Sequence, residues 1–122
     1  MTGYPPMHIN LSYTNQVSDY ISDYILRYNY DKIVCLTDEN TEVCYEQIPY
    51  LRDNDDILKI SIPSGESNKT LETVEQITEI LIEENFSRQS LLINLGGGVI
   101  SDLGGFIASI FKRGIPYINI PT

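Results

Sequence analysis

The chain has 122 residues, of which 42% are hydrophobic and 20% are charged, and its net charge is −9 at pH 7. This length fits one small domain that can bury roughly two-thirds of the surface of its unfolded chain. The acidic excess argues against nucleic acid and anionic membranes as partners, because both bind clusters of Lys and Arg. No apolar run approaches the length of a membrane span, and no basic and then apolar signal sequence is present. Cys35 and Cys44 fit neither a zinc-site nor a CxxC spacing, so we expect free thiols in a reducing cytoplasm.

Hydrophobic periodicity divides the chain into alternating strands and helices. Apolar residues at helical spacing alternate with short apolar runs that end at polar, Gly or Pro residues. In chain order the expected elements are strand Ile9–Tyr13, helix Gln16–Tyr28, strand Lys32–Thr37, a short helix after Asn40 weakened by Pro49, strand Ile57–Ile62, helix Thr70–Glu84, strand Leu91–Leu95, helix Val99–Lys112 and strand Tyr117–Ile120. This alternation predicts an α/β fold: a Rossmann-like, doubly wound, mostly parallel sheet with helices on both faces.

A run of three glycines, Gly96–Gly98, joins an apolar strand to an amphipathic helix. Three adjacent glycines lose much backbone entropy on folding, so we expect a conformation that side chains would block. Bare backbone at a helix N-terminus presents unpaired N–H groups and the positive end of the helix dipole, which suits a phosphate or pyrophosphate. The alternative is a tight strand-to-helix turn without a ligand.

Polar residues follow three of the predicted strands. Asp38 and Asn40 follow the first, Glu66 and Lys69 the second, and Asp102 comes after the glycine run. In a doubly wound sheet, ligands bind outside the carboxyl ends of the strands. Carboxylates for ribose hydroxyls, backbone donors for pyrophosphate and a nearby cation together suit a dinucleotide. However, a Rossmann fingerprint has the glycine loop first and the carboxylate about twenty residues later, so the standard fingerprint is not met.

Each of these polar residues also has a purely structural interpretation. The first pair can cap the helix that follows. The second pair can form an exposed ion pair worth under about 1 kcal/mol. Asp102, in the first turn after the glycines, can favour the helix dipole, and Lys112–Gly114 can be a cationic helix end with a glycine stop. We assign no role to His8.

Three segments resemble the 3-dehydroquinate synthase family of sugar-phosphate cyclases. Gly96–Ala108 is similar to the family signature GGGVxxDxxGFxA, and the likeness continues through Arg113–Pro116 to Thr122. Ser64–Thr73 resembles the GExxKxLET segment, and Thr37–Asn40 resembles the TDxN turn. The segments follow the family order. A departure occurs at Ser101, where relatives usually carry Gly.

The resemblance implies a cofactor role for each matching residue. The implied contacts with NAD are made by Asp38 and Asn40 at the adenosine ribose, Glu66 and Lys69 at the sugar and phosphate region, Gly97, Gly98 and Val99 at the pyrophosphate, Asp102 near the nicotinamide ribose, and Thr122 at the nicotinamide end. Arg113 resembles an arginine that reaches across a dimer interface to the phosphate of the substrate. The planar guanidinium suits that task.

The resemblance also implies an activity for the full-length protein. It implies a homodimer that uses NAD and a divalent metal, zinc or cobalt, to convert 3-deoxy-D-arabino-heptulosonate 7-phosphate to 3-dehydroquinate and phosphate. The metal ligands of the family belong to a helical C-terminal domain. We therefore interpret residues 1–122 as a truncated NAD-binding N-terminal domain that is inactive alone. The alternatives are another sugar-phosphate cyclase, a glycerol or iron-dependent alcohol dehydrogenase, and a non-catalytic nucleotide-binding module.

Overall fold

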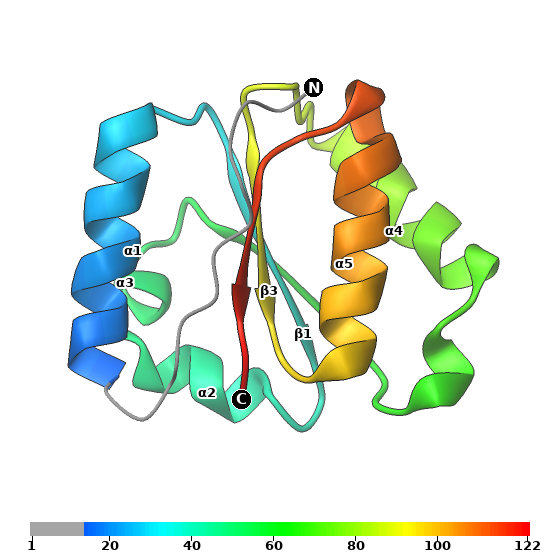
Figure 1. The fold of residues 1–122 in the computed structure, drawn as a ribbon, viewed down its shortest axis with the longest axis horizontal. Coiled ribbons are helices and arrows are strands. Elements are labelled where there is room, and N and C mark those ends of the chain that lie inside the picture. Colours follow the sequence, from blue (N-terminus) through cyan, green and yellow to red (C-terminus); the bar gives the residue numbers. More distant parts are fainter. Residues whose placement is uncertain (1–13) are drawn as a thin grey trace.

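Four parallel strands form one sheet in the computed structural model, which describes residues 14–122 (Figure 1). The strands are β1 (Ile33–Asp38), β2 (Leu58–Ile62), β3 (Leu91–Leu95) and β4 (Tyr117–Ile120). They lie in the order β2-β1-β3-β4, and each neighbouring pair is parallel. The predicted strand Ile9–Tyr13 and His8 lie outside the described residues.

The predicted helices are present, with shifted ends. The helical elements are α1 (Thr14–Tyr28), α2 (Glu42–Gln47), α3 (Pro49–Arg52), η2 (Glu66–Asn68), α4 (Leu71–Glu83), α5 (Gly98–Ile110) and η3 (Phe111–Arg113). The short helix expected after Asn40 is divided into α2 and α3, because Ile48, which precedes Pro49, is extended with φ −106° and ψ 104°. The last predicted helix stops at Ile110 rather than Lys112, because Phe111 is extended with φ −68° and ψ 122°, and Lys112 follows with a left-handed φ of 50°.

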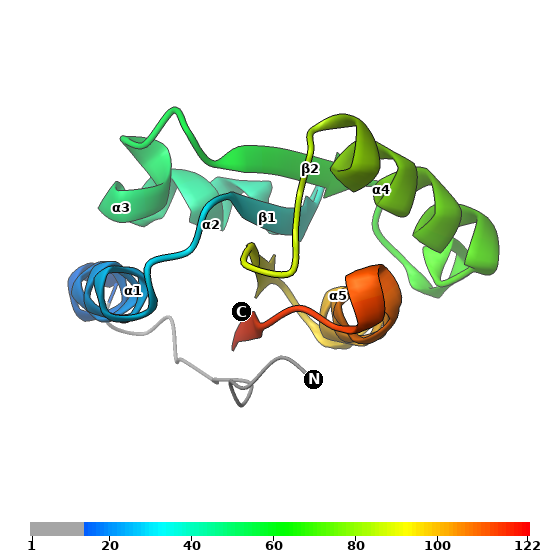
Figure 2. The same ribbon diagram turned by 90° about the horizontal axis from the view of Figure 1, so that it is seen from above.

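Helices cover both faces of the sheet (Figure 2). Side chains alternate along each strand, so Val34 and Leu36 pack towards α4 and α5, whereas Cys35 packs towards α1, α2 and α3. Each face has its own apolar core. The doubly wound fold with helices on both faces is confirmed. Within residues 14–122, no helix combines the length and apolar character that crossing a membrane requires.

The strand order creates a switch point between β1 and β3. From β1 the chain passes to β2 on one side, and then returns across β1 to β3 on the other side. The connections therefore diverge above the carboxyl ends of β1 and β3, which is where ligands bind in open α/β sheets. Thr41 joins these two ends, because its Oγ1 donates to the carbonyl of Leu95 at 2.9 Å.

Candidate functional site

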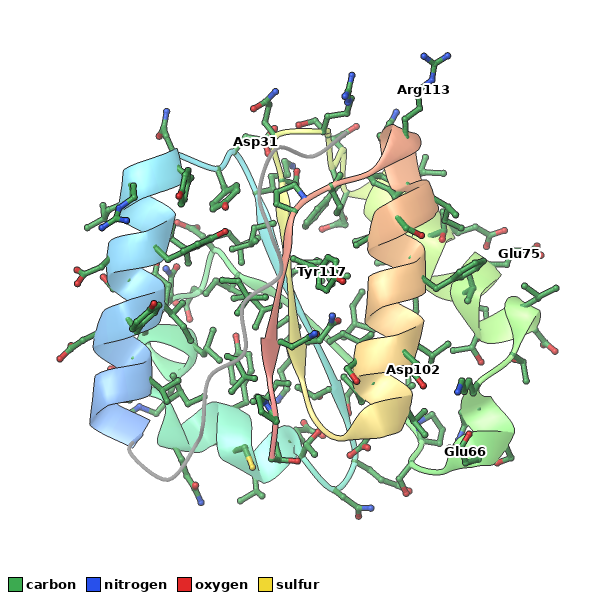
Figure 3. All side chains as sticks on the ribbon, viewed as in Figure 1. Asp31, Glu66, Glu75, Asp102, Arg113 and Tyr117 are labelled. Carbon is green, nitrogen blue, oxygen red and sulfur yellow. The ribbon has the colours of Figure 1, made fainter. Side chains whose placement is uncertain are left out.

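The carboxyl edge of the sheet brings together most of the predicted cofactor residues. Asp38 is the last residue of β1 rather than the first residue after it. The glycine run follows β3, and the loop after β2 carries η2 and Lys69. Figure 3 shows Glu66 and Asp102 at this same end of the molecule, with Arg113 at the other.

The three glycines of the run have different surroundings. The expected conformation that side chains would block is found at Gly96, and its cause is close packing rather than a positive φ, since the described glycines with positive φ are Gly65 and Gly114. At Gly96 a Cβ atom would lie 2.8 Å from Cγ1 of Ile100, so close packing requires glycine. At Gly97 and Gly98 a Cβ atom would meet no atom within 4 Å. No described contact therefore explains the absence of side chains at Gly97 and Gly98, whereas a ligand approaching the backbone would.

The backbone of this turn directs helix α5 towards the carboxyl edge. The N–H of Gly96 donates to the carbonyl of Ile120 at 3.1 Å, which fixes the turn beside the end of β4. Gly97 is the N-cap and has no side-chain capping bond. The N–H of Ser101 donates to the carbonyl of Gly97 at 3.1 Å, which closes the first turn of the helix. The N–H groups of that first turn have no partners within the helix and can bind an anion.

Asp38 organises the turn after β1. Its Oδ1 accepts hydrogen bonds from the N–H groups of Asn40 and Thr41, both at 2.8 Å. The N–H of Asp38 in turn donates to Oγ1 of Thr41 at 3.0 Å. These bonds close the turn before α2, whose N-cap is Thr41 without a side-chain capping bond, so the interpretation of Asp38 as a helix cap is wrong. In the cofactor interpretation, Oδ2 is the oxygen that would accept from a ligand hydroxyl.

Lys69 forms an ion pair that differs from the expected one. Its Nζ lies 2.8 Å from Oδ2 of Asp102, and this pair joins the N-terminal end of α4 to α5. The hydrogen bond and charge of Asp102, with a smaller contribution from the charge of Glu66, raise the pKa of Lys69. Asp102 lies beyond the first turn of α5, which has no acidic residue, so the helix-dipole explanation of Asp102 is wrong. Two residues that the resemblance links to NAD thus contact each other.

The remaining rim residues follow the ends of β1, β3 and β4. Asn40 is exposed, and Val99 is half-buried against the core shared by α4 and α5. Thr122 is exposed and lies two residues beyond Ile120, whose carbonyl accepts the N–H of Gly96.

Arg113 lies at the opposite edge of the sheet from the glycine run. It follows α5, whose 13 residues span about 20 Å. Lys112, Arg113 and Gly114 have φ values of 50°, 67° and 112°. Gly114 caps the short η3 turn, whereas α5 ends earlier at Ile110 with no basic residue in its last turn, so the predicted cationic end of α5 with a glycine stop is wrong.

No metal centre is formed by the residues that the structure describes. Within 14–122 there is no group of three or more His, Cys, Asp or Glu side chains that could hold an ion.

The sequence interpretation missed the part played by Thr41 at this edge. Thr41 is buried and bonds both to Asp38 and to the end of β3. Its signal in the sequence is weak, because a threonine three residues after an aspartate is common in turns.

The sequence of this chain is similar to that of known proteins. A family model described as 3-dehydroquinate synthase N-terminal matches residues 59–122. The 3-dehydroquinate synthase of Clostridium tetani is 41% identical over 100 residues, covering 82% of this chain and 27% of that protein. The 3-dehydroquinate synthase of Streptococcus pyogenes is 36% identical over 115 residues, covering 93% of this chain and 32% of that protein.

A solved structure shares the fold. The crystal structure of 2-deoxy-scyllo-inosose synthase complexed with carbaglucose-6-phosphate, NAD+ and Co2+ has a TM-score of 0.78 and 24% identity, over 94% of this chain and 32% of that chain. The present chain thus spans between 27% and 32% of the length of these three proteins.

Proposed function

The chain belongs to the 3-dehydroquinate synthase family, and from this premise we propose that residues 1–122 are the NAD-binding N-terminal domain of a 3-dehydroquinate synthase. The matched residues 59–122 include Glu66, Lys69, the glycine run, Asp102 and Arg113. The whole protein would convert 3-deoxy-D-arabino-heptulosonate 7-phosphate to 3-dehydroquinate and phosphate.

One observation carries the cofactor proposal: the open space in front of Gly97 and Gly98. A Cβ atom at either position would meet nothing within 4 Å, and both residues are exposed at the start of α5. A pyrophosphate could approach this backbone closely and accept hydrogen bonds from the N–H groups of the first helical turn. The residues present therefore fit the pyrophosphate of NAD.

The other rim residues have proposed roles that agree with their chemistry. The carboxylate of Asp38, helped by Asn40, would accept hydrogen bonds from the adenosine ribose hydroxyls. Lys69 and Asp102 would contact the sugar and phosphate region and the nicotinamide ribose. Glu66 would act beside Lys69, and Val99 and Thr122 would border the pyrophosphate and the nicotinamide end.

The chemistry itself would be shared with parts of the protein outside this chain. When bound, NAD supplies hydride transfer, while the residues of this domain hold and orient it. The divalent metal, zinc or cobalt, would be held by the C-terminal domain of the family. The NAD+, Co2+ and sugar phosphate named for 2-deoxy-scyllo-inosose synthase support this assignment. We expect the isolated chain to be inactive.

Arg113 would serve the neighbouring subunit of a homodimer. Its distance from the glycine run, about the length of α5, supports a role outside the cofactor site of its own chain. The protein would work in the cytoplasm, which agrees with its free cysteines. Burial raises the pKa of Cys35, and burial together with the charge of Asp38 raises that of Cys44, so both thiols stay protonated at neutral pH.

Calorimetric titration of NAD into the full-length protein tests this proposal. Gly97→Val would place a branched side chain in the open space, and we expect the Kd to rise at least about tenfold, or roughly 1.4 kcal/mol. Ser109→Val is a matched control, because Ser109 is exposed on the same helix away from the rim. Unchanged NAD affinity in folded Gly97→Val protein would show that the glycines serve only the turn.

A further inference from the structure

A pair of asparagines is buried between β3 and β4. Asn94 is 1% exposed and Asn119 is 8% exposed. The two residues are directly opposite in the parallel register, and Nδ2 of Asn94 donates to Oδ1 of Asn119 at 3.0 Å. Their neighbours along the strands, Ile93, Leu95, Ile118 and Ile120, are fully buried apolar residues. Burying amides in such surroundings is unfavourable unless a specific arrangement gains from it.

Helix α5 rests directly on this pair at Gly104. A Cβ atom at Gly104 would lie 1.6 Å from Oδ1 of Asn94 and 2.3 Å from its Cγ, so only glycine allows this approach. Within the described residues, Oδ1 of Asn94 has no hydrogen-bond partner. The amide therefore contacts two elements at once: it bonds to β4 and supports the backbone of α5.

The amide pair distinguishes one strand register from its alternatives. A shift of β4 by two residues would still set apolar side chains against apolar side chains on the α1 face, because Ile118 and Ile120 are alike. The same shift would separate Asn94 from Asn119 and leave a buried amide unpaired, which is costly. A single buried Asn fixes the register of coiled coils in the same way.

The ends of these two strands carry predicted cofactor contacts. Gly97 and Gly98 follow β3, and Thr122 follows β4. A two-residue shift would move one set past the other by about 6.6 Å. The asparagine pair lies only two residues before the glycine run, so it controls this alignment closely.

We propose that Asn94 and Asn119, covered by Gly104, are positioning residues that fix β3, β4 and α5 in the one alignment in which Gly97, Gly98 and Thr122 can bind NAD together. This inference rests on the proposed NAD-binding function. It assigns the buried amides to cofactor alignment rather than to stability.

An apolar replacement of the whole cluster separates these two roles. In the full-length protein, Asn94→Ala and Asn119→Val remove both amides, and Gly104→Ala supplies a methyl group in the space that the amide of Asn94 leaves. We expect the thermal unfolding midpoint of this triple variant to equal or exceed that of the wild type. The Kd for NAD, measured by calorimetry, should rise about tenfold or more. A stable triple variant whose Kd stays within about twofold of wild type would overturn the inference.

A matched pair decides the question should the triple variant not fold. Asn119→Thr and Asn119→Val have the same shape, but only the threonine hydroxyl can accept from Asn94. We expect a Kd within about threefold of wild type for Asn119→Thr and about tenfold higher for Asn119→Val, and equal values would overturn the inference. If the wild-type protein fails to bind NAD, the proposed function itself is wrong and this inference falls with it. If the wild-type protein binds NAD and the variants bind it with the same Kd, the proposed function stands and this inference alone fails.

Discussion

The two ends of helix α5 differ in backbone strain and in side-chain size. At the N-terminal end, Gly97 has an ordinary backbone with φ −83°, and what distinguishes the turn is the absence of side chains where there is room for them. At the C-terminal end, Lys112 and Arg113 keep long side chains on left-handed backbones. Such backbones cost on the order of 1–2 kcal/mol per residue for ordinary side chains. One end therefore leaves space for a ligand without backbone strain, and the other accepts strain to present a cation.

This difference shows that the glycines of one motif have separate causes. Gly97 and Gly98 face open space, Gly104 faces the amide of Asn94, and Gly114 supports a positive φ of 112°. Only the first two call for a partner from outside the domain. Strained residues such as Lys112 and Arg113 also point to function, because they persist only where surrounding structure holds them.

The largest expected effect belongs to the strained end. Arg113→Ala in the full-length protein should lower kcat/KM for the heptulosonate phosphate by about 2–3 kcal/mol, or roughly 30- to 150-fold, because a substrate phosphate loses its charged partner. NAD affinity and unfolding temperature should barely change. Steady-state assays and calorimetry measure the two sets of values.

Hybrid dimers control for the subunit that supplies this arginine. When Arg113→Ala chains are mixed with chains inactivated at the metal site, one site of each hybrid has intact metal ligands and a partner's intact arginine. Recovered activity supports the role across the interface. Confirmed hybrids without activity would show that Arg113 acts within its own chain.

Substitutions in the middle of α5 should change the free energy of unfolding instead. Gly104→Val should lower the free energy of unfolding by about 1–3 kcal/mol, because its side chain would overlap the amide of Asn94. Gly105→Ala is the matched control: its Cβ would make an ordinary contact of 3.8 Å with Tyr117, and alanine favours the helix. Urea denaturation measures both. Similar stability for Gly104→Val and wild type would contradict the close packing of α5 on β3.

Relief of strain at the cationic end should give a smaller effect of the opposite sign. Asn adopts left-handed backbones more readily than Lys, so Lys112→Asn should raise the free energy of unfolding by about 0.5 kcal/mol. Gln76→Asn, at an exposed helical position in α4, should instead lose a few tenths of a kcal/mol. Equal changes in the free energy of unfolding for the two variants would contradict the presence of backbone strain at Lys112.

The smallest effect concerns acid stability at the edge that holds Arg113. Partial burial alone would raise the pKa of Asp31, but hydrogen bonds from Ser87, Ser90 and backbone N–H groups outweigh it and lower the pKa from its usual value. A lowered carboxylate pKa stabilises the fold above the unfolded value and loses that contribution as the pH falls below it. Asp31 is exposed, so we expect under about 1 kcal/mol. Denaturation at pH 6 and pH 3 should therefore show a larger acid loss for wild type than for Asp31→Asn.

Within residues 14–122, periodicity was sufficient to predict the order of the main helices and strands and the helices on both faces of the sheet. Strands such as Leu91–Leu95 were predicted correctly because a run that is buried on both faces is almost wholly apolar. The end of α5 was predicted two residues late, because nothing in Lys112 or Arg113 itself indicates a left-handed backbone.

The site was harder to predict where it depends on tertiary contacts. The rim could be assembled from strand ends, but the partner of Lys69 could not, since Asp102 is 33 residues away and meets it only after α4 and α5 pack. Asn94 and Asn119 were predicted only as members of apolar strands, without a role of their own. Their value depends on being opposite each other, which a pattern along one strand does not reveal.

The ion pair between Lys69 and Asp102 affects how anion binding by the domain would depend on ionic strength. The cation that Lys69 brings to this edge is already balanced by a carboxylate at 2.8 Å, and the chain as a whole carries a charge of −9. Little net positive field is therefore left to draw a dianionic pyrophosphate in from a distance. Recognition would fall to neutral N–H dipoles, which act only at contact and are hardly screened by ions. The domain would thus retain its dinucleotide across a wide range of ionic strength, and its encounter rate would be that of an unsteered collision.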